Sequence, residues 1–564
     1  MSKKKRICEY DWKDLFWGIP FLMAIALIFW RCRYGIPDVD ESFYITVPYR
    51  LLQGDGLFVQ EWHLSQMAGI LLLPFVWLYR LIFGGMDGIF LAMRYLCCTV
   101  MGITGIFLYT RLKPFNQAGA AIASVAFTLY IPFGIPALSY NSLGIITLTV
   151  AMVLLLTAKG KRKLPFFIAG VFFAAAVLCN PYLLLLYIGY AIFLLVRRRH
   201  TFKETSCRVD TIRGFFYLTG GAAVVAFVFF GFVFLRVSIS EFFKALPLCL
   251  HDPEHPPLHL FEKIIDYFGS IGELHWVCAA VHIGLILLWI ICLLDKKRKE
   301  HKKTYFMISI ISIFILLINF YYCFFYLNFL MWPINLIAPF ALLLCDSPKA
   351  KNIFWLLWFP GMFYSFCMHL SSNQFFYAIF SGSAVATVGS AILLGMIAKE
   401  CFTEERVEVL AILIGFVMVW FISLMDVRYT NVFWDSPVEY QTEHIDQGIY
   451  RGINCSQDKM ENYKEHLKEW EIVNSYHPDK VLFLSKATWL YLLGDYESSA
   501  YSAWLSGVNV STIERLENYY ELNPDKMPDV VYVEKENRRY AMKFCQAFDY
   551  HTDYNKECII LTKQ

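Results

Sequence analysis

Charged residues are scarce in this sequence, and their scarcity excludes a soluble globular protein. Only 17% of the 564 residues are charged, whereas 57% are hydrophobic and the mean hydropathy is +0.47. Soluble domains carry roughly 25% charged residues. The net charge of +3 is small and gives no reason to expect a nucleic-acid partner. The composition therefore predicts a polytopic α-helical membrane protein that has the lipid bilayer as a partner.

Several motifs of soluble enzymes are also missing. The 16 cysteines form no CxxC pair and no Cys/His spacing typical of a zinc site. Neither a GxGxxG sequence nor a P-loop marks a nucleotide site. The segment "HDPEHPPLHL" does collect side chains that bind metals. A proline-stiffened loop is the favoured interpretation, so we assign no metal ligand and leave a divalent cation open as a cofactor. The side chains in this segment that could bind a metal are His251, Asp252, Glu254, His255 and His259.

Apolar runs and basic clusters predict the topology. A membrane span needs roughly 20 apolar residues, and clusters such as "MSKKKR" and "DKKRKEHKK" favour the cytoplasmic side. No signal-peptide cleavage site follows the first run, so we expect a retained anchor in the cell membrane. The N-terminus is expected in the cytoplasm and the C-terminus outside. About 13 spans are expected, near residues 15–31, 88–110, 117–133, 142–158, 164–178, 181–196, 213–236, 275–294, 305–327, 332–345, 353–368, 384–398 and 407–425.

One apolar run is expected not to cross. Residues 64–83 contain Pro74 near the middle and Arg80 near the end, and a further span here would place every later basic cluster outside. We therefore expect an interfacial or re-entrant helix on the outer face. Residues 33–87 then form a single outer segment with two juxtamembrane helices, at about 41–53 and at 64–83.

A polar region follows the last apolar run. We place the transmembrane domain at residues 1–425 and a soluble extracytoplasmic domain at residues 426–564. Within it, "KMENYKEHLKEWEIVNSY" and "STIERLENYYELNP" have helical periodicity, and "KVLFL" and "DVVYV" are typical of short strands. The alternation of helix and strand predicts a small α/β domain with a parallel sheet.

The first outer segment carries an acidic sequence, "PDVDESFY", next to the membrane. Asp40 and Glu41 stand where a helix is expected to begin. An N-cap or first-turn acid would stabilise that helix by about 1 kcal/mol or less. The alternative is that Asp40 is a functional carboxylate at the boundary between membrane and water. The second, non-spanning helix beside it favours this functional interpretation.

The segments "PDVDESFYITVPYRLLQGD" and "EWHLSQMAGILLLPFVWLYRLIFGG" resemble the first outer loop of GT-C glycosyltransferases. The closest branch is the one containing protein O-mannosyltransferases and lipid A aminoarabinose transferases, and the resemblance implies a bacterial protein. The shared features are a D-E-x-x-Y pattern, here Asp40 to Tyr44, two juxtamembrane helices, and a Phe-Gly ending. This sequence departs from the pattern at "HLSQ", where relatives often have His-Pro-Pro or Lys-Pro.

The resemblance implies a GT-C fold and transfer of a sugar from a polyprenyl-phosphate donor on the outer face of the membrane. The acceptor would be a glycan, lipid or protein of the cell envelope. Asp40 corresponds to the catalytic aspartate of the family and would act as general base, with Glu41 as its motif partner and Tyr44 as the motif tyrosine. His63 and Gln66 are candidates to replace the phosphate contact of the missing lysine.

Other polar residues on the outer side are candidates for substrate binding. Arg80 and Arg94 could contact the donor phosphate, although side chains that reach from the membrane to its surface are the favoured interpretation. Tyr140 and Asn141 could orient a sugar hydroxyl, or could form a simple turn. The same alternatives apply to His369, Asn373 and Gln374.

A transporter or flippase for lipid-linked or small polar substrates is the main alternative function. It predicts ionisable residues in the middle of spans, and often inverted repeats. The expected spans are nearly free of central charge, and we find no repeat. The transferase also accounts for the outer carboxylates, which a purely structural membrane protein would leave without a purpose.

Overall fold

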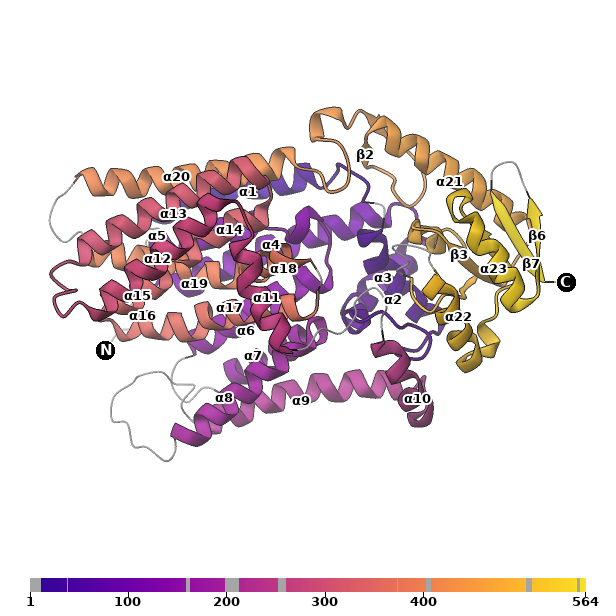
Figure 1. The fold of residues 1–564 in the computed structure, drawn as a ribbon, viewed down its shortest axis with the longest axis horizontal. Coiled ribbons are helices and arrows are strands. Elements are labelled where there is room, and N and C mark those ends of the chain that lie inside the picture. Colours follow the sequence, from indigo (N-terminus) through magenta and orange to yellow (C-terminus); the bar gives the residue numbers. More distant parts are fainter. Residues whose placement is uncertain are drawn as a thin grey trace, which may run out of the picture.

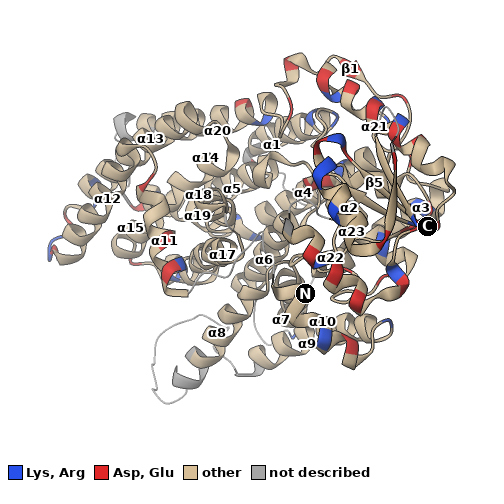
Figure 2. Ribbon diagram, turned by 45° about the vertical axis from the view of Figure 1, so that its right-hand side comes forward, with Lys and Arg blue, Asp and Glu red and all other residues tan. Residues whose placement is uncertain are grey.

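The computed structural model describes residues 12–37, 39–158, 163–197, 212–251, 260–372, 374–401, 407–503, 510–554 and 558–563. The chain forms a bundle of long helices joined to a C-terminal domain with a small β-sheet (Figure 1). Charged residues gather on the C-terminal domain and at the bundle ends, whereas the bundle itself is mostly uncharged (Figure 2).

The bundle is built from helices that suit a bilayer. Within the described residues, ten helices are long and apolar enough to cross a membrane, or eleven if the bent pair α18–α19 is one span. Phe227, for example, is 81% exposed, and such apolar surface requires lipid around it. The bundle helices are α1 (Trp12–Arg31), α4 (Ile89–Leu112), α5 (Gln117–Leu129), α6 (Tyr140–Thr157), α7 (Leu164–Cys179), α8 (Leu184–Arg197), α9 (Ile212–Phe234), α12 (Trp276–Leu294), α13 (Lys302–Phe324), α14 (Leu327–Asn335), α15 (Ala338–Leu344), α16 (Pro348–Ile353), α17 (Phe359–Leu370), α18 (Phe375–Gly382), α19 (Ala384–Cys401) and α20 (Val407–Thr430).

A helix stands at each of the expected spans, and the chain is a multi-pass helical protein. Three of these helices are apolar but short, namely residues 117–129, 164–179 and 181–192. Because a short helix does not meet the length needed to span a bilayer unaided, the count of thirteen stays a prediction. The sides on which the two termini lie stay predictions as well.

The first outer segment forms α2 (Asp40–Gln53), a short 3-10 turn (Gln66–Ala68) and α3 (Gly69–Phe83). Residues 66–83 pass the length and composition test for a span. However, the chain contacts the C-terminal domain both before α3, where the Trp62 amide donates to the Tyr501 carbonyl, and near its end, where Arg80 pairs with Asp495. A helix held at both ends by one domain has no need to cross, and the non-crossing assignment stays a prediction.

Two further helices, α10 (Ile239–Leu250) and α11 (Leu260–Gly272), lie between α9 and α12 in the sequence. Serine caps α10, since Ser238 accepts from the Glu241 amide and Glu241 accepts from the Ser238 amide. Both helices are strongly amphipathic, as expected of segments at the surface of a membrane.

The C-terminal domain contains a mixed sheet with the order β4-β3-β5-β7-β6. Strand β3 is parallel to β4 and β5, as predicted, but β7 is antiparallel to β5 and β6. The two predicted strands are therefore parallel to each other, but the sheet as a whole is mixed, because a hairpin that was not predicted extends it. The elements are β1 (Glu443–His444), β2 (Asn454–Cys455), α21 (Gln457–Ser475), β3 (Lys480–Leu484), β4 (Glu497–Ser498), α22 (Val510–Leu522), β5 (Val530–Val533), α23 (Arg538–Phe548), β6 (Tyr550–Tyr554) and β7 (Ile559–Lys563).

The helix α2 lies between the bundle and the C-terminal domain (Figure 1). One face of α2 bonds to that domain along its length, and its residues follow the helical spacing of three to four. Ser42 and Thr46 bond to Thr488, Tyr49 donates to the Gly494 carbonyl, and Gln53 donates to the Tyr496 carbonyl. The domain therefore holds α2 from its first turn to its last.

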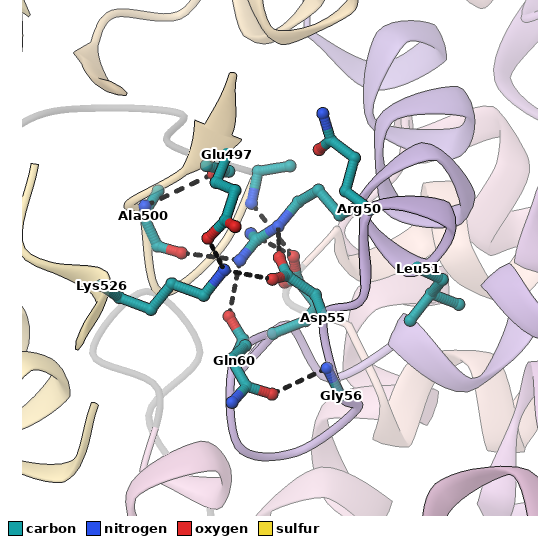
Figure 3. Close-up of polar contacts among 12 residues, drawn as sticks. Arg50, Leu51, Asp55, Gly56, Gln60, Glu497, Ala500 and Lys526 are labelled. Carbon is teal, nitrogen blue, oxygen red and sulfur yellow. Dashed lines mark hydrogen bonds and ion pairs between the residues drawn. The ribbon is translucent and has the colours of Figure 1, made fainter. Parts of the chain in front are cut away.

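A buried ionic cluster completes this interface (Figure 3). Arg50, 1% exposed, pairs with Asp55 and with Glu61, both at 2.7 Å, and donates to the Ala500 carbonyl at 2.9 Å. On the other side, Lys526 of the C-terminal domain pairs with Asp55 at 2.7 Å. Buried charges are stable only when they are paired and hydrogen bonded, so this cluster requires both parts of the chain.

Candidate functional site

The first turn of α2 presents two neighbouring acids in different environments. Glu41 is fully buried, and its two carboxylate oxygens accept from Nε and Nη2 of Arg94, at 2.7 and 2.5 Å. Arg94 also donates to the carbonyls of Cys32 and Gly35. The pair connects α2 to α4 and fixes the end of α1. Glu41 is thus occupied in a structural ion pair, and Arg94 is not placed to contact a donor phosphate.

Asp40 remains available for chemistry. Its carboxylate is half-buried and makes no hydrogen bond or ion pair with another described residue. Burial raises the pKa of Asp40 to about 6, because a partly dry environment disfavours the charged form. A carboxylate of this kind is mostly ionised at neutral pH and still basic enough to accept a proton.

A cleft lies between α2, the start of α3 and the start of α6, and Asp40 is not among the residues that line it. The cleft is shallow, with an enclosed volume of about 10 Å³, which is about the room for one water molecule. Tyr44, four residues after Asp40 and therefore on the same face of α2, packs edge-on against Tyr140 with ring centroids 5.8 Å apart. The cleft is lined by Phe43, Tyr44, Val47, Ser65, Ala68, Gly69, Leu72 and Tyr140.

Local sequence explains why these two tyrosines meet. Ser139 caps α6 and forms a reciprocal capping box with Ser142, so Tyr140 is the first residue of that helix. Burial raises the pKa of Tyr44 well above its usual value, which keeps its hydroxyl protonated at neutral pH. Asp40 is close enough to both tyrosines to interact with them electrostatically. Two aromatic rings in the cleft thus lie near the Asp40 carboxylate, and aromatic rings with a polar group nearby suit a sugar.

The two candidates from "HLSQ" differ in their placement. The His63 ring packs on Phe43 at 4.3 Å between centroids, and its Nδ1 is 2.8 Å from the Ser65 hydroxyl. Both neighbours line the cleft, so His63 lies at its edge. Gln66 is buried, accepts from the Phe58 amide and donates to the Cys249 sulfur. Gln66 therefore supports the loop and is not free to bind phosphate.

Arg80 and Asn141 also differ from what was expected. Arg80 pairs with Asp495 at 2.6 Å and lies over the Tyr49 ring, so it joins α3 to the C-terminal domain. Asn141 is buried in the first turn of α6, next to Tyr140. Neither side chain lines the cleft.

The candidates near residue 370 form a separate group. His369 is buried, and its Nε2 lies 3.1 Å from Asp266 and from the Lys263 carbonyl, both on α11. Its contacts therefore attach α11 to α17. Gln374 is exposed, and Asn373 lies outside the described residues. Asn180 donates to Ser371 at 3.1 Å, which joins two of the expected outer loops.

Metal ligands were left open by the sequence. No group of three or more His, Cys, Asp or Glu side chains that could hold a metal occurs within the part of the chain that the structure describes. Residues 252–259, which contain most of the candidate ligands, lie outside that part.

The sequence did not point to the residues that hold α2 in place. Arg50, Asp55 and Glu61 are charges within or next to an apolar-rich juxtamembrane helix, and that unusual setting was the available signal. Thr488 had no signal, since its partners Val39 and Ser42 are more than 440 positions away in the sequence.

Replacing Asp40 by asparagine is expected to stabilise the protein at pH 8 and to stabilise it much less at pH 4.5. The folded-state pKa of Asp40, about 6, lies above its ordinary value of 3.8. Ionisation therefore costs stability, and the cost appears as the pH rises from 4 through 6. The full cost is about 1 to 3 kcal/mol, from roughly 1.4 kcal/mol for each pKa unit. Thermal unfolding in detergent at the two pH values measures it, and an equal effect at both would contradict a raised pKa.

The class of protein that these observations define is a multi-pass helical membrane protein with a cleft on the face that carries its C-terminal domain. Comparison with known proteins finds solved structures of similar fold. No family model matches the sequence, and no curated protein is similar to it. The fold is similar to that of the archaeal oligosaccharyltransferase AglB from Archaeoglobus fulgidus, solved in complex with an inhibitory peptide and a dolichol-phosphate. The identity is 11% and the TM-score 0.40, over 98% of this chain and 75% of AglB. A similarity of this size does not identify the function.

Proposed function

We propose that the protein is a GT-C glycosyltransferase that moves a sugar from a polyprenyl-phosphate donor to an acceptor on the outer face of the membrane. The observation that carries the proposal is the state of Asp40. It is the first residue of α2, it makes no hydrogen bond or ion pair with another described residue, and it is close enough to interact electrostatically with Tyr44 and Tyr140, which line the cleft. The neighbouring Glu41 is paired with Arg94, which leaves Asp40 as the base.

In the proposed reaction Asp40 accepts the proton of an acceptor hydroxyl. The hydroxyl oxygen forms a bond to the anomeric carbon, and the bond from that carbon to the phosphate oxygen breaks. The electron pair leaves with the polyprenyl phosphate. The donor is anchored in the membrane by its lipid tail, which explains why the carboxylate belongs at the membrane boundary. Tyr44 and Tyr140 orient the sugar, and His63 at the edge of the cleft contacts the phosphate.

A donor panel tests the proposal. Purified protein in detergent is supplied with polyprenyl phosphates carrying mannose, glucose or aminoarabinose, together with a membrane lipid extract as the source of acceptors. Mass spectrometry follows the release of free polyprenyl phosphate and the appearance of a glycosylated product. We expect both from at least one donor, in equal amounts. Failure with the whole panel would count against the reaction class.

A further inference from the structure

Thr488 of the C-terminal domain contacts the first turn of α2. This residue follows the loop that leaves β3 and begins a 3-10 turn, Thr488–Leu492. It is 2% exposed, and its amide donates to the Lys486 carbonyl at 2.9 Å. The loop is thereby folded so that Thr488 faces α2.

Thr488 makes three contacts with the residues on either side of Asp40. Its hydroxyl is hydrogen bonded to the Ser42 hydroxyl and donates to the Val39 carbonyl at 3.5 Å. Its own carbonyl accepts from the Thr46 hydroxyl at 3.5 Å. The Val39 carbonyl also accepts from the Ser42 hydroxyl at 2.8 Å. Asp40 stands in the chain between Val39 and Ser42, the two residues that Thr488 holds.

The start of α2 has no cap of its own, and contacts from outside hold it, namely the Glu41–Arg94 pair and Thr488. The N-cap residue is Val39, which makes no side-chain cap hydrogen bond, whereas most helix starts use Ser, Thr, Asp or Asn for this purpose. An uncapped first turn frays easily. A general base must stay within hydrogen-bond reach of the proton that it removes, so a moving first turn would displace Asp40 from its substrate.

We propose that Thr488 of the C-terminal domain is a positioning residue for Asp40. Its hydroxyl bonds to Val39 and Ser42 on either side of Asp40 and fixes the turn that carries the base, so the soluble domain is part of the catalytic machinery. The inference rests on the proposed function, because it assigns a role within that reaction.

The variants Thr488→Val and Thr488→Ser separate the hydroxyl from the packing. Valine keeps the shape and removes the hydroxyl, and serine keeps the hydroxyl. Gln53→Ala is the matched control, since it removes a hydrogen bond to the same domain from the last turn of α2. That position is 13 residues from Asp40, or about 20 Å along the helix. Initial rates of polyprenyl phosphate release give kcat and the KM for the donor.

We expect Thr488→Val to lower kcat about tenfold with KM within about twofold, since a misplaced catalytic group costs rate more than binding. Thr488→Ser and Gln53→Ala should stay within about twofold of the parent. In the Asp40→Asn background, Thr488→Val should cause no further loss, because the two residues act as a unit.

Several results would overturn the inference. An unchanged kcat in Thr488→Val would show that the hydroxyl does not position the base. An equal loss in Thr488→Ser, or in Gln53→Ala, would point to packing or to general docking of the domain. A further loss in the Asp40→Asn background would show that Thr488 acts elsewhere. If Asp40→Asn itself is fully active, Asp40 is not the general base and the proposed function is contradicted. That result is distinct from those above, which concern Thr488.

Discussion

Replacement of Asp40 by asparagine is expected to lower kcat by about 10²- to 10⁴-fold, the usual contribution of a general base. Asparagine keeps the size and polarity of the side chain but cannot accept the proton. The KM for the donor should change little, since the base acts on the acceptor. The rate of polyprenyl phosphate release under saturating donor measures the effect.

Two control variants test whether the loss of kcat is specific to the Asp40 carboxylate. Asp40→Glu keeps a carboxylate and should retain more activity than Asp40→Asn, although the longer side chain displaces it. Asp495→Asn removes a carboxylate of the C-terminal domain that is 81% exposed and pairs with Arg80, and it should leave kcat unchanged. Because Asp40→Asn is also expected to be more stable than the parent at pH 8, unfolding would not explain a loss. Full activity in Asp40→Asn would remove Asp40 from the reaction.

Replacement of Arg50 by methionine is expected to cost about 3 to 5 kcal/mol, the penalty for leaving buried charges without a partner. Methionine has a similar length, but Glu61 loses its cation and Asp55 keeps only Lys526. The C-terminal domain should then separate from α2 more easily. Limited proteolysis and the midpoint of thermal unfolding measure the effect.

The control for Arg50 is Arg80→Met. Arg80 also joins the first outer segment to the C-terminal domain, but its side chain is 38% exposed and its partner Asp495 is 81% exposed. Ion pairs of this kind contribute about 0 to 1 kcal/mol. Equal stability of the two variants would contradict a structural role for the buried cluster. A loss of stability in Arg80→Met alone would show that Arg80, and not Arg50, makes the larger contribution to stability.

Much of the local structure could be predicted from the sequence. Hydrophobic periodicity and length are local properties, so helices were found at the expected spans, and α2 begins at Asp40. The alternation of helix and strand likewise predicted α21, β3, α22 and β5. The closing hairpin β6–β7 was not predicted, because short strands at the end of a polar region carry little periodicity.

The roles of individual residues were harder to predict, because partners are set by tertiary packing. Asp40 and Glu41 are adjacent acids in the same local sequence. Arg94, 53 positions away from Glu41, nevertheless forms an ion pair with Glu41 and not with Asp40. Gln66 was a reasonable phosphate ligand because of its place in "HLSQ". Its side-chain amide is instead hydrogen bonded to the Phe58 amide and to the Cys249 sulfur. The sequence gives no means of choosing between such neighbours, whereas burial and hydrogen bonds separate them.

The central claim is that the protein cleaves a lipid-linked sugar rather than moving it intact. Proteoliposomes made with the active polyprenyl-phosphate sugar test this most directly, with mass spectrometry of the lipid after incubation. The account predicts that free polyprenyl phosphate accumulates with time in the parent and not in Asp40→Asn. Transfer of the intact donor from one leaflet to the other, without any free polyprenyl phosphate, would contradict the account and favour a flippase.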